Sequence, residues 1–134
     1  MNIRPAVSDD FPALARLDRH IPPQALEASL RLGRISIAEI HGALAGWLRW
    51  GLFWDSIPFL NLLFVLDGHR GQGLGRALME HWEAQMRQSG YPALLTSTQS
   101  NELAQHFYYR MGYAAVGGFL PPNEPYELIL AKKL

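Results

Sequence analysis

The chain has 134 residues, and 49% of them are hydrophobic, so we expect one domain, spanning residues 1–134, with a core of its own. Twelve basic and twelve acidic residues give a formal net charge of zero, which argues against a protein that binds nucleic acid or a membrane surface through charge. The absence of cysteine excludes disulfides, thiolate metal sites and a cysteine nucleophile.

The first third of the chain predicts one strand and two helices. Residues 3–6 form a short strand, and Ser8 is placed to cap the helix that follows. The apolar residues expected on the inner face of this helix are Phe11, Leu14 and Leu17. A second helix is expected from Pro23 to Leu32, where Gly33 can end it. No apolar signal region precedes these elements and no run approaches the ~20 apolar residues of a membrane span, so we expect a cytoplasmic protein.

An antiparallel meander of three strands is expected next. Its first strand spans residues 34–40, and a His-Gly turn at residues 41–42 leads into a second strand over residues 44–53. An Asp-Ser turn at residues 55–56 then leads into a third strand over residues 57–65. Because this third run is mostly apolar and shows little alternation, we expect a buried strand.

A glycine-rich bend at residues 69–76 separates the meander from the longest expected helix. This helix runs to about Gly90, and Pro92 follows its end. On its inner face we expect Leu74, Ala77, Leu78, His81, Trp82 and Gln85. Away from the centre of that face we expect Arg76, Glu80, Glu83 and Arg87.

The C-terminal part predicts a strand over residues 93–98, a short helix over 101–111, and a strand pair over 113–119 and 126–131. A strand, helix and strand in this order normally make the two strands parallel neighbours with a right-handed crossover. We therefore expect residues 93–98 to lie beside the strand that precedes the bend.

The bend has the properties of a phosphate site. The first turn of a helix carries unpaired amides and a partial positive charge, and glycines remove the side chains that would keep an anion away. Arg70 and Arg76 bracket the bend, and a guanidinium can hold phosphate oxygens in pairs. The bend does not match the dinucleotide fingerprint, because Leu78 stands at its third glycine position, and it lacks the Lys-Ser/Thr of a P-loop. On the glycines alone, a tight turn with no ligand explains it as well.

A second informative segment runs from Asn101 to Tyr113. Asn101 is placed to cap a helix, and Ala104 and Tyr108 fall on one helical face, four residues apart. Taken alone, this aromatic segment is also typical of a helix packed against the core.

Together the two segments resemble the two main motifs of the GNAT family of N-acetyltransferases, in the right order and over most of the chain. Arg70, Gly73 and Gly75 stand at the positions of the family's pyrophosphate loop. The residues that match the second motif are Asn101, Ala104, Phe107, Tyr108, Gly112 and Tyr113.

This resemblance implies an α/β (α+β) fold with a mixed, mostly antiparallel sheet of about six to seven strands and about four helices. The fourth and fifth strands splay apart and hold acetyl-CoA between them. The resemblance places the cofactor against Leu63, Phe64, Val65, Arg70, Gly71, Gln72, Gly73, Leu74, Gly75, Arg76, Asn101 and Tyr108. It implies pairing of the pantetheine arm with the main chain of residues 63–65, and binding of the pyrophosphate by the amides of residues 71–75. No metal is expected, since no pair of histidines has a metal-binding spacing.

The implied reaction is direct attack of an amine on the acetyl thioester. Tyr108 stands where many relatives carry the acid that protonates the leaving sulfur, and we prefer it to the adjacent Tyr109, which faces another side of the helix. Many relatives carry a glutamate as the base near the position of Asn61, and an amide cannot take up a proton at neutral pH. The base is left open among Asp55, Glu124, Glu127, water-mediated transfer, or none if the amine arrives neutral.

The resemblance identifies the acetyl donor better than the acceptor. Aromatic residues that either line an acceptor pocket or pack in the core are Trp47, Trp50, Phe53, Trp54 and Tyr126. We prefer a small amine or an amino-acid-like acceptor to a protein amine, and a homodimer is consistent with the resemblance. Two alternatives remain: a non-catalytic acyl-CoA sensor, which the missing carboxylate at Asn61 would permit, and a structural interaction protein whose bend binds nothing.

Overall fold

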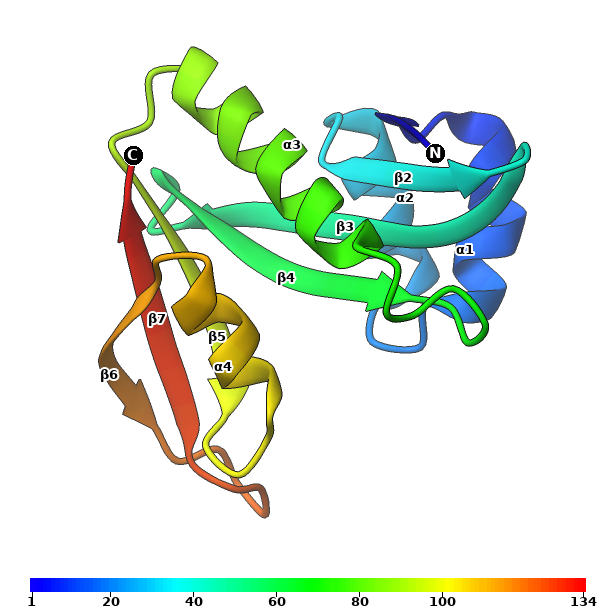
Figure 1. The fold of residues 1–134 in the computed structure, drawn as a ribbon. Helices are drawn as coiled ribbons and strands as arrows, with labels where there is room; N and C mark the ends of the chain where they lie inside the picture. The colour runs from blue at the N-terminus through cyan, green and yellow to red at the C-terminus, as the bar shows by residue number, and fades with distance from the viewer.

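A computed structural model describes residues 1–134, and a single seven-stranded sheet runs through it in the order β1-β2-β3-β4-β5-β7-β6 (Figure 1). The strands are β1 (Asn2–Pro5), β2 (Ile35–Ile40), β3 (Ala43–Phe53), β4 (Ile57–Val65), β5 (Ala93–Gln99), β6 (Ala114–Phe119) and β7 (Glu127–Lys133). The helices are α1 (Phe11–Leu17), α2 (Pro23–Arg31), α3 (Leu74–Gln88) and α4 (Ala104–Arg110), and a 3-10 turn, η1 (Ser8–Asp10), precedes α1. All neighbouring strands are antiparallel except β4 and β5, so the expected mixed sheet is confirmed. No helix is long and apolar enough to cross a membrane.

The start of the first helix differs from the expectation. The Ser8 side chain caps nothing; instead, the Asp10 carboxylate accepts a hydrogen bond from the Val7 amide at 2.7 Å. The same carboxylate pairs with the Arg4 guanidinium at 2.8 Å, which fixes β1 to the beginning of α1. A charged acceptor with two partners replaces the serine cap, and α1 begins at Phe11.

Both hairpin turns of the meander contain two successive residues with positive φ angles. His41 and Gly42 have φ angles of 53° and 76°, and Trp54 and Asp55 have φ angles of 54° and 58°. Two successive residues of positive φ are typical of the two-residue turns that match the twist of antiparallel strands. The second turn is therefore made by Trp54 and Asp55, one residue earlier than the expected Asp-Ser pair.

Two clusters of buried side chains form the core. The larger, of 15 residues, contains much of α3 together with Tyr108, Met111 and Tyr113. The smaller, of 6 residues, contains Leu14 and Leu26 from α1 and α2.

The buried face of α3 is rotated from the expected one. The buried residues of this helix are Leu74, Leu78, Met79, Trp82, Glu83 and Met86. Glu83 is inside because its carboxylate accepts hydrogen bonds from the Tyr113 hydroxyl at 2.8 Å and from Lys132 Nζ at 2.9 Å. His81, which was expected on the inner face, is exposed. Periodicity alone assigns glutamate outward, because the two partners lie 30 and 49 residues away.

Strands β4 and β5 separate after a short region of contact. Their paired positions are Phe59 with Leu95 and Leu60 with Thr96. At the next residue of β4 the register with β3 also shifts, since Arg49 pairs with Leu62 and Trp50 pairs with Leu60. Asn61 therefore has no partner on β3, and a bulge of this kind bends a strand and increases its twist. The expected splay between the fourth and fifth strands is confirmed (Figure 1).

Candidate active site

The second half of β4 leaves main-chain groups free on the side of the gap. The Leu66 amide donates to the Ala45 carbonyl at 2.8 Å, so Leu66 faces β3. Main-chain groups alternate in direction along a strand, which turns those of Phe64 toward β3 and those of Leu63 and Val65 toward the gap. The Val65 carbonyl is indeed bonded outside the sheet, because it accepts a hydrogen bond from Arg70 Nε at 3.0 Å.

Phe64 differs from its two neighbours in this respect. It pairs with Trp47 of β3, and its ring stacks on the Trp47 indole with the centroids 5.1 Å apart. Three residues were expected to pair with the pantetheine arm. Of these, only Leu63 and Val65 have main-chain groups that face the gap.

The glycine-rich bend lies at the end of β4 and opens into a cavity of about 480 Å³. Its lining residues are Leu63, Val65, His69, Arg70, Gly71, Gly73, Leu74, Gly75, Arg76, Ala104 and Phe107. Gly71 and Gly73 have φ angles of 75° and 83°, a region that side chains disfavour, and an added Cβ at either would meet no atom within 4 Å. The first helical hydrogen bond of α3 joins the Ala77 amide to the Gly73 carbonyl, so the amides of residues 74–76 lack helical acceptors.

The two arginines of the bend are exposed and already paired with acids. Arg70 lies 3.4 Å from Asp67, and its guanidinium carbon is 5.5 Å from the centroid of the Phe64 ring. Arg76 bonds Glu80 one turn further along α3 at 2.7 Å. Both pairs are solvent-exposed and therefore weak, so an anion at the bend can compete for these guanidinium groups.

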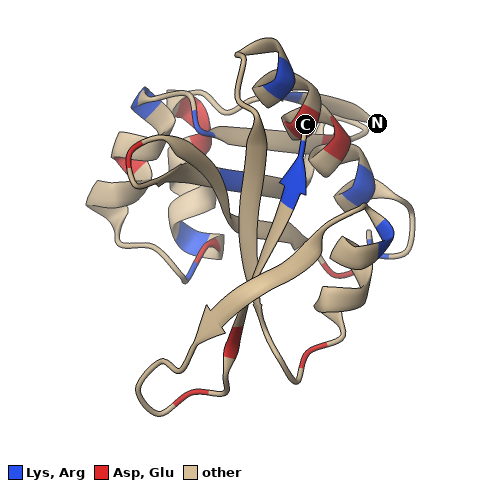
Figure 2. Cartoon of the chain, turned by 90° about the vertical axis from the view of Figure 1, so that its left-hand side faces the viewer, with Lys and Arg blue, Asp and Glu red and all other residues tan.

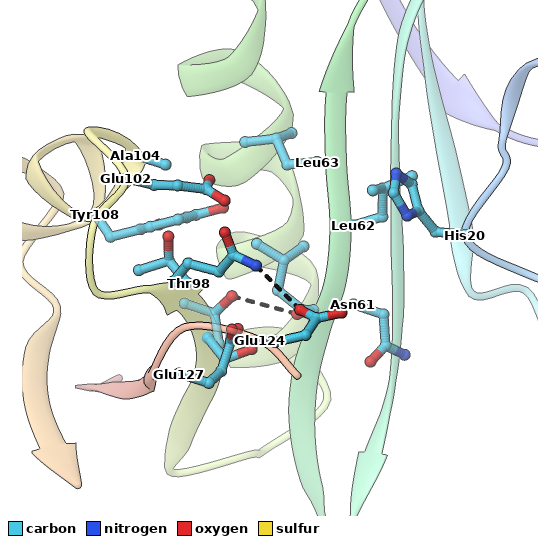
Figure 3. A pocket seen from close by; sticks show the side chains of 14 residues that line it. His20, Asn61, Leu62, Leu63, Thr98, Glu102, Ala104, Tyr108, Glu124 and Glu127 are labelled. Atoms are coloured by element: carbon cyan, nitrogen blue, oxygen red, sulfur yellow. Dashed lines mark hydrogen bonds between the residues drawn. The ribbon is translucent and has the colours of Figure 1, made fainter. Parts of the chain in front are cut away.

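A second cavity, of about 520 Å³, continues along the gap between β4 and β5 (Figure 3). The residues that line it are His20, Leu60, Asn61, Leu62, Leu63, Thr96, Ser97, Thr98, Gln99, Glu102, Ala104, Tyr108, Glu124 and Glu127. It shares Leu63 and Ala104 with the cavity at the bend. The two cavities therefore form one groove and meet at these two residues.

Tyr108 is a buried polar side chain of this second cavity. It is 8% exposed, and its side chain points into the cavity from α4 (Figure 3). Burial raises the pKa of Tyr108 to about 12; the nearby Glu102 charge adds to the rise and the Thr96 hydroxyl opposes it. The phenol thus keeps its proton at neutral pH. Tyr109 is 38% exposed, lines no part of the groove and contacts Gln105, as expected for a residue on another side of α4.

Asn101 does not take the predicted position. Helix α4 begins at Ala104 rather than Asn101, and Asn101 is exposed and lines neither cavity. The preceding residues form a turn in which the Glu102 amide donates to the Gln99 carbonyl, and Gln105 Nε2 donates to the Ser100 carbonyl at 2.9 Å. This side-chain bond from within the helix satisfies the turn without an asparagine cap, and it brings Glu102 to the cavity.

His20 reaches the cavity because a buried ion pair holds its loop. Asp18 and Arg49 are both buried, with Arg49 Nε 2.9 Å from Asp18 Oδ2. Trp47 Nε1 donates to the same oxygen at 3.2 Å, and the other oxygen accepts from the His20 amide at 3.1 Å. The loop between α1 and α2 is thereby fixed against β3, with His20 at the rim of the cavity (Figure 3).

Several lining residues were not predicted from the sequence. His20 and Glu102 carried no local signal, since each lies in a loop far along the chain from the residues that it faces. A signal did exist in β5, whose Thr-Ser-Thr-Gln run at residues 96–99 is unusually polar for a strand between two others. Thr96 and Thr98 are buried and face the cavity.

The structure shows which candidate bases and which aromatic residues line this cavity. Glu124 and Glu127 line the cavity, whereas Asp55 lies in the exposed β3–β4 turn outside it. Trp47 and Trp50 are buried in the core, and none of the five aromatic residues considered for an acceptor pocket lines this cavity. No group of three or more His, Asp or Glu side chains is arranged to hold a metal ion.

A mixed sheet that opens beside a glycine-rich helix start, with a buried tyrosine in the gap, is the architecture of CoA-dependent acyltransferases. The model of the acetyltransferase (GNAT) family matches residues 3–113, and the chain belongs to this family. The resemblance drawn from the two motifs is thereby confirmed. The protein is an acyltransferase that takes acetyl-CoA as its acetyl donor.

Three relatives illustrate the range of the similarity. An uncharacterized N-acetyltransferase of Methanocaldococcus jannaschii is 32% identical, over 84% of this chain and 78% of the relative. The streptothricin acetyltransferase of Streptomyces lavendulae is 40% identical over 48% of this chain, which corresponds to 34% of that protein. The ribosomal-protein-alanine N-acetyltransferase of Brucella melitensis has the same fold, with a TM-score of 0.84 over 100% of both chains at 21% identity.

Proposed function

We propose that this protein transfers the acetyl group of acetyl-CoA to a primary amine of a small molecule, with Tyr108 as the proton donor to the leaving sulfur. The observation that carries the proposal is the meeting of two cavities at Leu63 and Ala104. One cavity contains the glycine-rich bend, and the other contains the buried Tyr108. The proposal assigns the activity to one domain over residues 1–134, because all seven strands belong to one sheet.

The residues of the bend fit the phosphates of the donor. Open space at Gly71 and Gly73, the free amides at the start of α3 and the exposed Arg70 and Arg76 together favour a polyanion. The pantetheine arm would extend along β4 and pair with the groups of Leu63 and Val65 that face the gap. Because Arg70 already occupies the Val65 carbonyl, we assign the pairing chiefly to Leu63 and to the Val65 amide.

The part of the groove where the two cavities meet, at Leu63 and Ala104, is the proposed position of the thioester. Acetyl-CoA supplies an acetyl group whose bond to sulfur breaks as the amine nitrogen forms a bond to the carbonyl carbon. The Leu63 amide, which faces the gap, would donate to the carbonyl oxygen as its negative charge grows; a donor so placed typically lowers the barrier by about 3 kcal/mol. Tyr108 would give its proton to the departing sulfur and recover one from solvent.

The amine must also lose a proton. The side chains that could accept it, directly or through a water molecule, are those of Glu124 and Glu127, since both line the acceptor side of the cavity. Asn61 lies against Gly51, with its amide nitrogen 3.0 Å from where a Gly51 Cβ would stand, and it offers no base.

A small acceptor is favoured by the size of the cavity. Its volume of about 520 Å³ is in the range of small-molecule sites. No Arg or Lys lines it, and His20 at the rim is its one basic side chain, so a free carboxylate on the acceptor would find no permanently charged cation there. This observation favours a simple amine over the amino-acid-like acceptor that the sequence also suggested.

The test is thiol release from acetyl-CoA in the presence of a panel of small primary amines. Amine-dependent release, with a product heavier than the amine by one acetyl group, is the expected result. The rival function is an acyl-CoA sensor, which the amide at Asn61 would permit. Tight binding of acetyl-CoA without turnover on any amine, including peptides, would favour the sensor and reject the transferase.

A further inference from the structure

The acceptor side of the groove contains three carboxylates without cationic partners. Seven of the twelve acidic residues form ion pairs: Asp10, Asp18, Glu27, Glu39, Asp67, Glu80 and Glu83. Of the five that form none, Glu102, Glu124 and Glu127 line the one cavity beside Tyr108. The cavity is the acceptor site on grounds other than its charge, because it contains the buried Tyr108 and joins the cofactor groove at Leu63.

The loop that carries Glu124 is fixed in position. Gln99 Nε2, at the end of β5, donates to Glu124 Oε2 at 3.1 Å (Figure 3). The Ser100 amide donates to the Tyr126 carbonyl at 2.8 Å, and Asn123 has a φ angle of 59°, which marks a tight turn just before Glu124. The prolines at residues 121, 122 and 125 restrict the loop further. The Gln99 amide holds the Glu124 carboxylate at the cavity wall and, being neutral, adds no positive charge beside it.

Charge is separated along the groove. Arg70 and Arg76 lie at the end where the donor's phosphates are proposed to bind, and the three glutamates lie at the other end. In Figure 2 the lower end of the molecule, where the β6–β7 loop lies, carries acidic positions and no Lys or Arg. Such a field attracts cations to the acceptor side and repels acceptors that carry a carboxylate.

We propose that the acceptor is a small di- or polyamine, with at least two ammonium groups and no carboxylate. This inference rests on the proposed function and narrows its acceptor. One nitrogen, as the free amine, attacks the thioester near Leu63 and gives up its proton to a water molecule; the other stays protonated and is bound by Glu124 and Glu127. The forming C–N bond and the breaking C–S bond are those of the reaction described above, so the distal ammonium takes part only through its charge.

A panel of three acceptors with four carbons each tests the charge requirement. The acceptors are 1,4-diaminobutane, 1-aminobutane and 4-aminobutanoate, compared by kcat/KM at saturating acetyl-CoA. We expect the diamine to exceed the monoamine by about tenfold, mainly through a lower KM, and the amino acid to be the poorest. Equal values for the three, or a preference for the amino acid or for a peptide N-terminus, would overturn the inference while leaving the transferase intact.

A double variant, Glu124→Gln with Glu127→Gln, tests which residues carry the preference. The expected result is a fall of the diamine-to-monoamine ratio from about ten toward one. The matched control is Asp9→Asn with Glu27→Gln, which removes the same two charges from exposed positions outside the groove. If the double variant slows both amines equally, so that the ratio stays at about ten, the two carboxylates do not recognise the second ammonium and the proposal is wrong.

A binding measurement separates this inference from the proposed function. Calorimetry of each amine with the CoA-loaded protein does not depend on turnover. Tighter binding of the diamine than of the monoamine, lost in the double variant, supports the charge recognition even if no thiol is released. Equal binding of the two amines rejects it.

Discussion

Leu60 and Thr96 are the last paired residues of β4 and β5, and the Thr96 hydroxyl donates a hydrogen bond to the Leu60 carbonyl at 3.2 Å. Beyond this pair the strands diverge, and the bulge at Asn61 directs β4 away from its neighbour. Thr96 also lies beside Tyr108, whose pKa its hydroxyl lowers against the larger effect of burial. One residue thus marks both the closed end of the gap and the position of the proposed acid.

Replacing Tyr108 with Phe tests the acid. The substitution removes one hydroxyl from a buried ring and leaves the packing intact, so we expect kcat to fall by about 100-fold while the affinity for CoA stays within about twofold. Steady-state kinetics and calorimetry measure the two quantities. The control is Tyr109→Phe, which alters the exposed neighbour and should leave both unchanged. A full kcat in Tyr108→Phe would remove the residue from the mechanism.

Replacing Gly73 with Val tests the phosphate loop. The φ angle of 83° imposes strain of about 1–2 kcal/mol on any side chain, and the new group would project where the pyrophosphate is proposed to bind. We expect the affinity for CoA to fall by more than about tenfold. Gly42→Val is the matched control, because Gly42 has a φ angle of 76°, equally open surroundings and a place in a hairpin turn lining neither cavity of the groove. Equal CoA affinity in the two variants would mean that the phosphates bind elsewhere.

Removing the Lys132 amine tests the buried Glu83. In Lys132→Met the carboxylate keeps only the Tyr113 hydroxyl as a partner, and the Met111 carbonyl loses its donor at 2.7 Å. We expect the free energy of unfolding to fall by about 2 kcal/mol in urea melts. Lys133→Met, at an exposed neighbour that forms no ion pair, should change little. Adding Glu83→Gln to Lys132→Met removes the unpaired charge and should recover part of the lost stability. A further loss of stability in the double variant would show that other groups hold the Glu83 carboxylate.

Alkaline pH should destabilise the fold through Tyr108. Its pKa is about 12 in the folded protein and about 10 in an unfolded chain, so between these values the unfolded chain loses the proton while the folded protein keeps it. Stability therefore falls as the pH rises through this window, by up to about 3 kcal/mol from this group. Burial also raises the pKa of Tyr113, and Glu83 adds to that rise, so its contribution has the same sign.

The measurement is urea unfolding at about pH 9 and about pH 11 in the natural protein and in Tyr108→Phe. The variant lacks the titrating hydroxyl and should lose less stability between the two values. Equal losses in the two proteins would show that Tyr108 is not buried in the way described.

The order of the elements was predictable, and the donor site could be proposed, because both have local signals in the sequence. The strand, the glycines and the helix that follow one another around residues 57–88 predict a strand, a bend and a helix from local signals alone, and the structure has all three. The face of α3 was predicted wrongly at Glu83 and His81, because the partners that bury Glu83 are distant in sequence. The prediction that the helix starts at Asn101 was also wrong. A side-chain hydrogen bond from Gln105 to the Ser100 carbonyl closes the turn that precedes α4 instead.

The acceptor side was less predictable than the donor side. Its wall is assembled from four separate segments, which contribute His20, Asn61, Glu102 and the pair Glu124 and Glu127. The bulge at Asn61 and the buried Asp18–Arg49 pair that position this wall arise from packing between segments. The periodicity of apolar residues in the sequence predicts neither the bulge nor the ion pair.

We propose above that the donor's pantetheine arm pairs with β4 in the gap. Amide hydrogen exchange, followed by NMR with and without saturating acetyl-CoA, tests it at single residues. We predict that the amides of Leu63 and Val65 exchange more slowly by about tenfold or more in the complex, while the amide of Phe64, already paired with β3, changes little. Unchanged exchange at Leu63 and Val65, with acetyl-CoA demonstrably bound, would contradict the account.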